Sequence, residues 1–130
     1  MNESLNQESV QEITFIKLKA ENGKDEITFP LEDLLFFEAN QNYVNIHLKT
    51  EVKKIRLKLK MVEKELTNIS AISRTHRAFL VNILQVEEIL SDARLVKIKL
   101  KDSDILIPVS RTYHAHFKSS LQKRETPATT

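Results

Sequence analysis

The chain lacks or is poor in the residues that many redox and nucleotide sites require. It contains no cysteine, which excludes disulfide bonds, a thiolate nucleophile and a cysteine-ligated zinc or iron–sulfur site. Its single glycine, Gly23, cannot form the phosphate-binding loops of nucleotide enzymes, because those loops need several positions without a Cβ atom. Neither thiol chemistry nor a nucleotide-binding loop is therefore expected.

Long apolar segments and aromatic residues are also scarce. No uninterrupted apolar run approaches the roughly 20 residues of a membrane-spanning helix, and residues 1–9 lack the basic and apolar regions of a signal peptide. Aromatic residues make up 6% of the chain and do not recur at alternate positions of its basic segments, which disfavours a stacking platform for RNA or single-stranded DNA. We expect a cytoplasmic protein with no membrane contact.

Charge is unevenly distributed along the chain. Residues 1–40 carry nine acidic residues against three lysines, a net charge of −6, whereas residues 41–130 carry 17 basic against nine acidic residues, a net charge of +8. This asymmetry favours a polyanionic partner such as nucleic acid, although a well-solvated surface would show the same pattern.

Hydrophobic periodicity predicts a mainly β (α+β) fold built from short strands. Alternating or short apolar runs predict strands at residues 13–18, 26–29, 34–39, 44–48, 55–59, 79–83, 96–100 and 105–109. Helical spacing links Leu59, Val62, Leu66 and Ile69, and it recurs in a terminal segment at Tyr113, Phe117 and Leu121.

One globular unit is expected between the polar ends of the chain. Residues 1–12 are expected to form a flexible arm or linker remnant, residues 13–121 one domain, and residues 122–130 a disordered tail.

Catalytic and metal-binding patterns are not found. His114 and His116 are the only close histidine pair, and on a helix residues two apart point in different directions. No nucleophile elbow of the form GxSxG occurs, and the carboxylates do not cluster among apolar neighbours. The sequence therefore predicts a protein that is not an enzyme and that uses no cofactor and no small-molecule substrate.

Three joints between predicted elements stand out by composition. Residues 40–43 form a polar turn, residues 74–77 place three basic or potentially basic groups before a strand, and residues 110–113 open the terminal helix. Ser110 is placed to cap that helix, and Arg111 projects from the end where free N–H groups attract phosphate. Taken separately, an ordinary turn is the better account of residues 40–43, a solvated loop explains residues 74–77 equally well, and a plain helix cap is the alternative for residues 110–113.

Together these joints resemble the LytTR domain, the output module of many bacterial response regulators in two-component systems. Residues 36–44 (FFEANQNYV) resemble its opening motif, residues 74–82 (RTHRAFLVN) its central segment, and residues 107–113 (IPVSRTY) its closing motif. The three motifs occur in family order and with family spacing. The similarity extends from about residue 13 to residue 121.

The resemblance implies an elongated arrangement of small antiparallel β-sheets with short flanking helices. It also implies sequence-specific binding of double-stranded DNA in transcription regulation, with loops entering successive major grooves at repeated promoter half-sites and a second copy on the adjacent half-site. Family hairpins often carry glycine near positions 50 and 104, where this chain has Thr50 and Asp104, so those turns are expected to use other geometries.

The resemblance assigns roles to individual residues. It implies base contacts by Asn42, Tyr43, Arg77 and Arg111, and phosphate contacts are expected from Lys53, Lys54, Arg56, Arg74, His76 and Ser110. Arg77 and Arg111 suit guanine, because a planar guanidinium matches the O6 and N7 acceptors. The Tyr43 ring could instead pack on the scaffold, and Asn82 is expected to be structural.

Two further alternatives stay open. The same scaffold could be a protein-interaction module that sequesters a related regulator, although the presence of Arg77 and Arg111 argues against this role. Residues 1–12 supply neither the receiver domain nor the membrane helices that accompany many family members. The chain therefore either acts alone or is one piece of a longer regulator.

Overall fold

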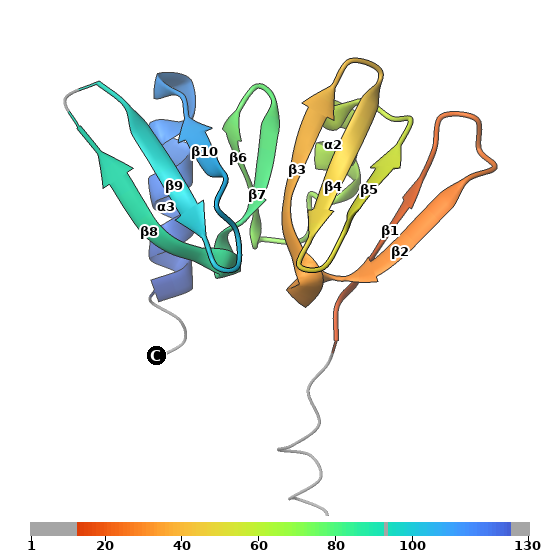
Figure 1. Cartoon of the computed structure of the whole chain (residues 1–130), viewed down its shortest axis with the longest axis horizontal. Coiled ribbons are helices and arrows are strands. Elements are labelled where there is room, and N and C mark those ends of the chain that lie inside the picture. Colours follow the sequence, from red (N-terminus) through yellow and green to blue (C-terminus); the bar gives the residue numbers. More distant parts are fainter. Residues whose placement is uncertain (1–12, 93, 126–130) are drawn as a thin grey trace, which may run out of the picture.

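Three small antiparallel sheets lie side by side in the computed structural model, which describes residues 13–92 and 94–125 (Figure 1). The strands and helices are β1 (Phe15–Lys19), β2 (Glu26–Pro30), η1 (Leu31–Asp33), β3 (Leu34–Asn40), β4 (Tyr43–Leu48), β5 (Val52–Ile55), α2 (Leu59–Glu65), β6 (Ile72–His76), β7 (Phe79–Asn82), η2 (Ile83–Gln85), β8 (Val86–Ser91), β9 (Val96–Leu100), β10 (Leu106–Val109), η3 (Arg111–Tyr113) and α3 (His114–Glu125). The expected elongated, mainly β arrangement is confirmed.

The central sheet has five strands in the order β5-β4-β3-β7-β6. A two-stranded sheet, β1-β2, lies at one end, and a three-stranded sheet, β10-β9-β8, lies at the other (Figure 1). Every strand pair within these sheets is antiparallel. Helix α2 lies behind the central sheet and α3 behind the three-stranded sheet in this view.

The central sheet separates two hydrophobic cores, because successive side chains of a strand point to opposite faces. Phe37 of β3 is fully buried in the core that contains Val62 of α2, whereas its neighbour Phe36 is buried in the core that contains Phe117 and Leu121 of α3. Strand β3 therefore contributes side chains to both hydrophobic cores.

The terminal helix is longer than the sequence predicted. Phe117 and Leu121 are buried as their spacing indicated, but α3 continues to Glu125, so the expected disordered tail does not begin at residue 122. Residues 122–125 are Gln, Lys, Arg and Glu, all good helix formers. The remainder of the predicted tail, and the predicted arm at residues 1–12, lie outside the described residues.

The predicted strand at residues 55–59 is wrong. Ile55, Leu57 and Leu59 are all buried, but β5 ends at Ile55 and α2 begins at Leu59. Leu59 also belongs to the helical pattern with Val62 and Leu66, and burial of all three in one core favours the helix there.

Asn82 is structural, as expected. It is fully buried, its Nδ2 donates to Leu31 O at 3.1 Å and Leu34 O at 2.9 Å, and its Oδ1 accepts from Leu84 N at 3.1 Å. The last bond caps η2, so β7 ends at Asn82 instead of reaching Ile83.

Two turns use a left-handed backbone conformation without glycine. Gln41, in the turn between β3 and β4, has a φ of 60°, and Asp102, between β9 and β10, has a φ of 61°. Aspartate tolerates this region better than most residues. The β9–β10 turn thus places its positive φ at Asp102 and needs no glycine at position 104.

Candidate nucleic-acid interface

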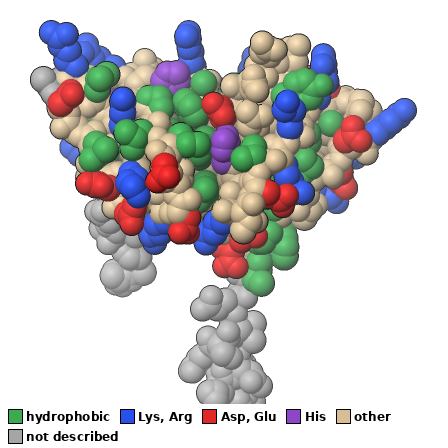
Figure 2. Space-filling view, viewed as in Figure 1, with side chains coloured by type: hydrophobic (Ala, Val, Ile, Leu, Met, Phe, Trp, Pro, Cys, Tyr) green, Lys and Arg blue, Asp and Glu red, His purple; other side chains and the backbone are tan. Residues whose placement is uncertain are grey.

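The three joints singled out in the sequence lie on one side of the molecule. The turn of residues 41–42, the turn of residues 77–78 and the junction of β10 with η3 all lie along the upper side in Figure 1. Strands β3, β6 and β10 all run toward this side, so each delivers its C-terminal end there. Lys and Arg side chains project furthest from this upper side in the space-filling view (Figure 2).

Backbone hydrogen bonds connect the three joints. Ala39 N donates to Ala78 O at 2.9 Å, which joins the end of β3 to the β6–β7 turn. Ser110 N donates to Thr75 O at 2.8 Å, which joins the closing junction to the end of β6. The three joints therefore form one continuous surface at the ends of β3, β6 and β10, which we call the upper edge.

Arg77 and Arg111 are two exposed cations of this edge. Arg77 occupies the β6–β7 turn and Arg111 is the first residue of η3. Neither guanidinium makes an ion pair with an acidic side chain within residues 13–92 and 94–125. Both groups thus keep their charge and donors available to a ligand.

Tyr43 lies beside two other cations. Its side chain is 37% exposed, and its ring centroid lies 5.3 Å from Lys54 Nζ and 5.6 Å from Arg56 Cζ. These cation–π contacts hold the two cations next to the β3–β4 turn, in which Asn42 is exposed.

Lys53 and Lys54 point to opposite faces of β5. Lys53 pairs with Ile46, a core residue, and its Nζ lies 3.7 Å from Glu51 Oε2. Arg56 is also paired, since its Nε lies 3.6 Å from Glu21 Oε1. Lys54 has no carboxylate partner in the described part of the chain, so it is the freest cation of this group.

His76 is oriented by its own turn. Its Nδ1 accepts a hydrogen bond from Ala78 N at 3.0 Å, and its ring packs edge-on against Phe79 with centroids 5.7 Å apart. Because Nδ1 accepts, the neutral ring carries its proton on Nε2, which can then donate to a ligand.

Arg74 does not lie in a loop, as the sequence suggested, but on strand β6. Its side chain is only 12% exposed, and its guanidinium contacts Glu63 of α2 and two backbone carbonyl groups of the β6–β7 turn. A guanidinium engaged in this way is poorly placed for the expected phosphate contact.

Ser110 does not cap the terminal helix through its side chain, contrary to expectation. The helix opens with the 3-10 turn η3, in which Tyr113 N bonds to the carbonyl oxygen of Ser110 at 2.9 Å. That N–H group is one of the donors that the hydroxyl would have accepted from. Within the described residues the Ser110 hydroxyl makes no hydrogen bond.

One acidic side chain close to this side is stabilised in its charged form. Asp92 follows β8, and its carboxylate accepts from the backbone N–H groups of Arg94 and Leu95, both at 2.9 Å. These hydrogen bonds hold the pKa of Asp92 below its ordinary value. Arg94 follows Asp92 in the same turn, and Lys97 of β9 is close enough for its charge to lower that pKa further, so the turn is not purely acidic.

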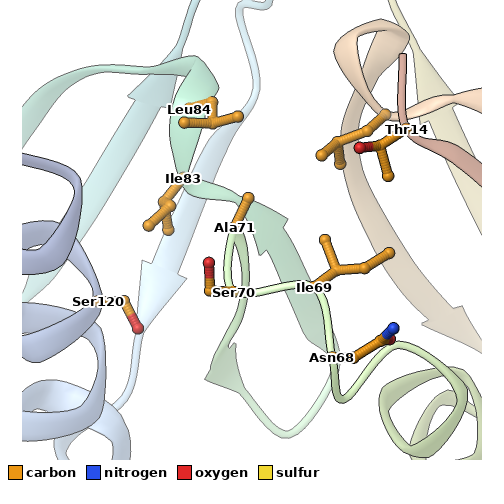
Figure 3. A pocket seen from close by; sticks show the side chains of 9 residues that line it. Thr14, Asn68, Ile69, Ser70, Ala71, Ile83, Leu84 and Ser120 are labelled. Atoms are coloured by element: carbon orange, nitrogen blue, oxygen red, sulfur yellow. The ribbon is translucent and has the colours of Figure 1, made fainter. Parts of the chain in front are cut away.

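A cleft lies at the other ends of β6 and β7. It has a volume of about 510 Å³, and Figure 3 shows residues of the α2–β6 loop, η2 and α3 around it. Its lining contains no ionisable side chain: Thr14, Leu31, Asn68, Ile69, Ser70, Ala71, Ile83, Leu84 and Ser120. It therefore offers no acid–base pair for catalysis.

The described residues offer neither a cluster of metal ligands nor a membrane-spanning helix. No group of three or more His, Cys, Asp or Glu side chains could hold a metal ion within residues 13–92 and 94–125. No helix in this part of the chain is long and apolar enough to cross a bilayer.

Sequence analysis missed the residues that support the joints. Glu63 is an exposed residue of α2, and no motif singles it out, yet its carboxylate accepts a hydrogen bond from Arg74. Thr75 and Ala78 contribute backbone carbonyl groups, which no side-chain pattern can reveal.

Comparisons with known proteins agree with this arrangement. A family model for the LytTr DNA-binding domain matches residues 24–122. A solved LytTr DNA-binding domain from Bacillus cereus has a similar fold, with a TM-score of 0.66 and 20% identity over 83% of this chain and 96% of that one. No curated protein matched the sequence. Since the family model spans most of the chain, this protein belongs to the LytTR family of DNA-binding domains.

Proposed function

We propose that the chain is a cytoplasmic bacterial transcription regulator that binds double-stranded DNA by sequence, with two copies on repeated promoter half-sites and no cofactor. The Bacillus cereus domain with a similar fold is described as part of a response regulator, which supports the same role for this chain. The observation that carries the proposal is the pair of exposed, unpaired guanidinium groups of Arg77 and Arg111 on the upper edge.

In this proposal the upper edge reads bases with its turns. Arg77 and Arg111 each bind the O6 and N7 atoms of a guanine in the major groove, because a planar guanidinium matches those two acceptors. Asn42 and Tyr43 contact bases from the β3–β4 turn, where both side chains are exposed. The three joints lie at the ends of three different strands, β3, β6 and β10, which suits contacts in successive grooves.

The cations beside the turns hold the phosphate backbone. Lys54 and Arg56 flank the Tyr43 ring, so they would contact phosphates next to the β3–β4 turn. His76 Nε2 and the Ser110 hydroxyl are suited to donate to phosphates near the other two joints. Lys53 points away from this group and is the weakest member of the expected set.

Selection from random duplex DNA by the purified chain tests the proposal. Enrichment of a repeated motif that contains guanine is expected, and the enriched duplex supplies the specific site for the experiments below. If no motif were enriched although the chain bound duplexes, sequence-specific binding would be ruled out. A protein-interaction module would bind no duplex under the same conditions.

Affinity for duplex DNA should fall steeply with salt, because each neutralised phosphate releases counterions. The slope of log affinity against log salt should be about −0.9 per phosphate contact, and Lys54→Ala should reduce its magnitude by about one unit on all sequences. Lys49→Ala is the matched control, since Lys49 is also exposed but lies in the turn at the other end of β4. A slope near zero for the unmodified chain would contradict phosphate binding.

A further inference from the structure

The guanidinium of Arg74 binds backbone carbonyl groups of the β6–β7 turn. Arg74 Nε donates to His76 O at 3.0 Å, and Arg74 Nη2 donates to Arg77 O at 3.0 Å. Nη1 donates to Glu63 Oε1 of α2 at 2.7 Å. The two carbonyl groups belong to the residues whose side chains were expected to contact DNA.

The turn needs such support because the strand pairing is irregular beside it. The register between β6 and β7 shifts between Arg74 and His76, which leaves Thr75 as the extra residue of a bulge. Bulges redirect the side chains that follow them and interrupt the ladder of backbone hydrogen bonds. Arg74 lies before this interruption, and its planar fork binds two carbonyl groups that follow it, those of His76 and Arg77, a geometry that a lysine could not reproduce.

We propose that Arg74 is a positioning residue for base reading: oriented by Glu63, it fixes the direction in which Arg77 leaves the β6–β7 turn. This inference rests on the proposed function. It replaces the phosphate contact expected for Arg74 from the sequence, because the side chain is 12% exposed and three of its nitrogen atoms already donate within the protein.

The two roles predict opposite results for Glu63→Gln. If Arg74 positions Arg77, loss of the carboxylate loosens the turn and weakens base reading. The ratio of the affinity for the selected duplex to the affinity for an unrelated duplex should then fall by about threefold, the effect of losing a partly exposed ion pair. If Arg74 contacted phosphate, the same change would free it and strengthen binding to both duplexes equally. Glu65→Gln is the matched control, because Glu65 is also an exposed glutamate of α2 and has no ion pair in the described part of the chain.

Arg74→Lys provides a second measurement. It keeps the charge and should lower the ratio by about tenfold, within the range that one bidentate base contact discriminates. The loss should be confined to the base pair that Arg77→Ala also affects, and it should disappear in the Arg77→Ala background. The base pair affected by Arg111→Ala should be unchanged.

The outcomes separate this inference from the function on which it rests. An unchanged ratio in Glu63→Gln and Arg74→Lys, or a loss spread evenly over all base pairs, would overturn the positioning role while DNA binding stood. Failure of the unmodified chain to bind the selected duplex would overturn the proposed function and the inference with it. Melting curves of each variant show whether the fold is retained.

Discussion

Replacing Phe117 with alanine is expected to lower the free energy of unfolding by about 3–5 kcal/mol, the usual cost of removing a buried phenylalanine ring. The side chain is 4% exposed and lies in the same core as Phe36 and Val109. Removing the ring leaves a cavity between α3 and the sheets. Urea denaturation followed by circular dichroism would measure the loss.

Leu106→Ala is the control for this prediction. Leu106 is also apolar and lies on β10, but it is 41% exposed, so its truncation should cost about 1 kcal/mol or less. An unchanged midpoint for Phe117→Ala would mean that α3 does not pack as described. Helices η3 and α3 are continuous after Ser110. The Phe117 variant should therefore lose specific DNA binding at a lower urea concentration than the one at which its strands unfold.

The second large effect is expected on affinity for the selected duplex. Arg111→Ala and Arg77→Ala should each cost about 1–3 kcal/mol of binding free energy, which is the discrimination that a bidentate arginine–guanine pair provides. Each loss should be confined to a different base pair. The combined variant should lose about the sum if the two turns occupy separate grooves.

Lysine substitutions separate base reading from charge. Arg111→Lys keeps the positive charge but removes the planar fork, so a guanine contact predicts relaxed discrimination, whereas a phosphate contact predicts nearly normal binding. Equal weakening of both alanine variants on selected and unrelated duplexes would place these arginines on phosphates. Binding to each duplex can be measured by fluorescence anisotropy.

The sequence predicted the elements whose burial follows a simple period. Residues 96–100 alternate between lysine and aliphatic side chains, and Ile98 and Leu100 of β9 are fully buried. Strand β8 was missed because it is an edge strand in which Val86 is the single buried residue, so no alternation marks it. Strand β6 was missed because its fully buried positions are Ser73 and Thr75, which read as polar.

The sequence predicted which residues make up the candidate site, but not the contacts that hold them in place. The motif residues Asn42, Arg77 and Arg111 identify the joints, and strand direction brings those joints to one side. Arg74 carries the same charge as Arg77 and lies three residues before it, so the sequence could not show that its guanidinium binds within the protein instead of a phosphate. The difference arises from packing of α2 near β6, which brings Glu63 within 2.7 Å of Arg74.

Guanine contacts by Arg77 and Arg111 are the central claim, and atom-specific changes to the DNA test it most directly. Each guanine of the selected duplex would be replaced in turn by 7-deazaguanine, which lacks the N7 acceptor. Replacement of the guanine that Arg77 contacts should weaken binding by the unmodified chain, and so should replacement of the guanine that Arg111 contacts. Each alanine variant should be insensitive to replacement of its own partner guanine only. Identical responses of the unmodified chain and both variants at every guanine would contradict the claim.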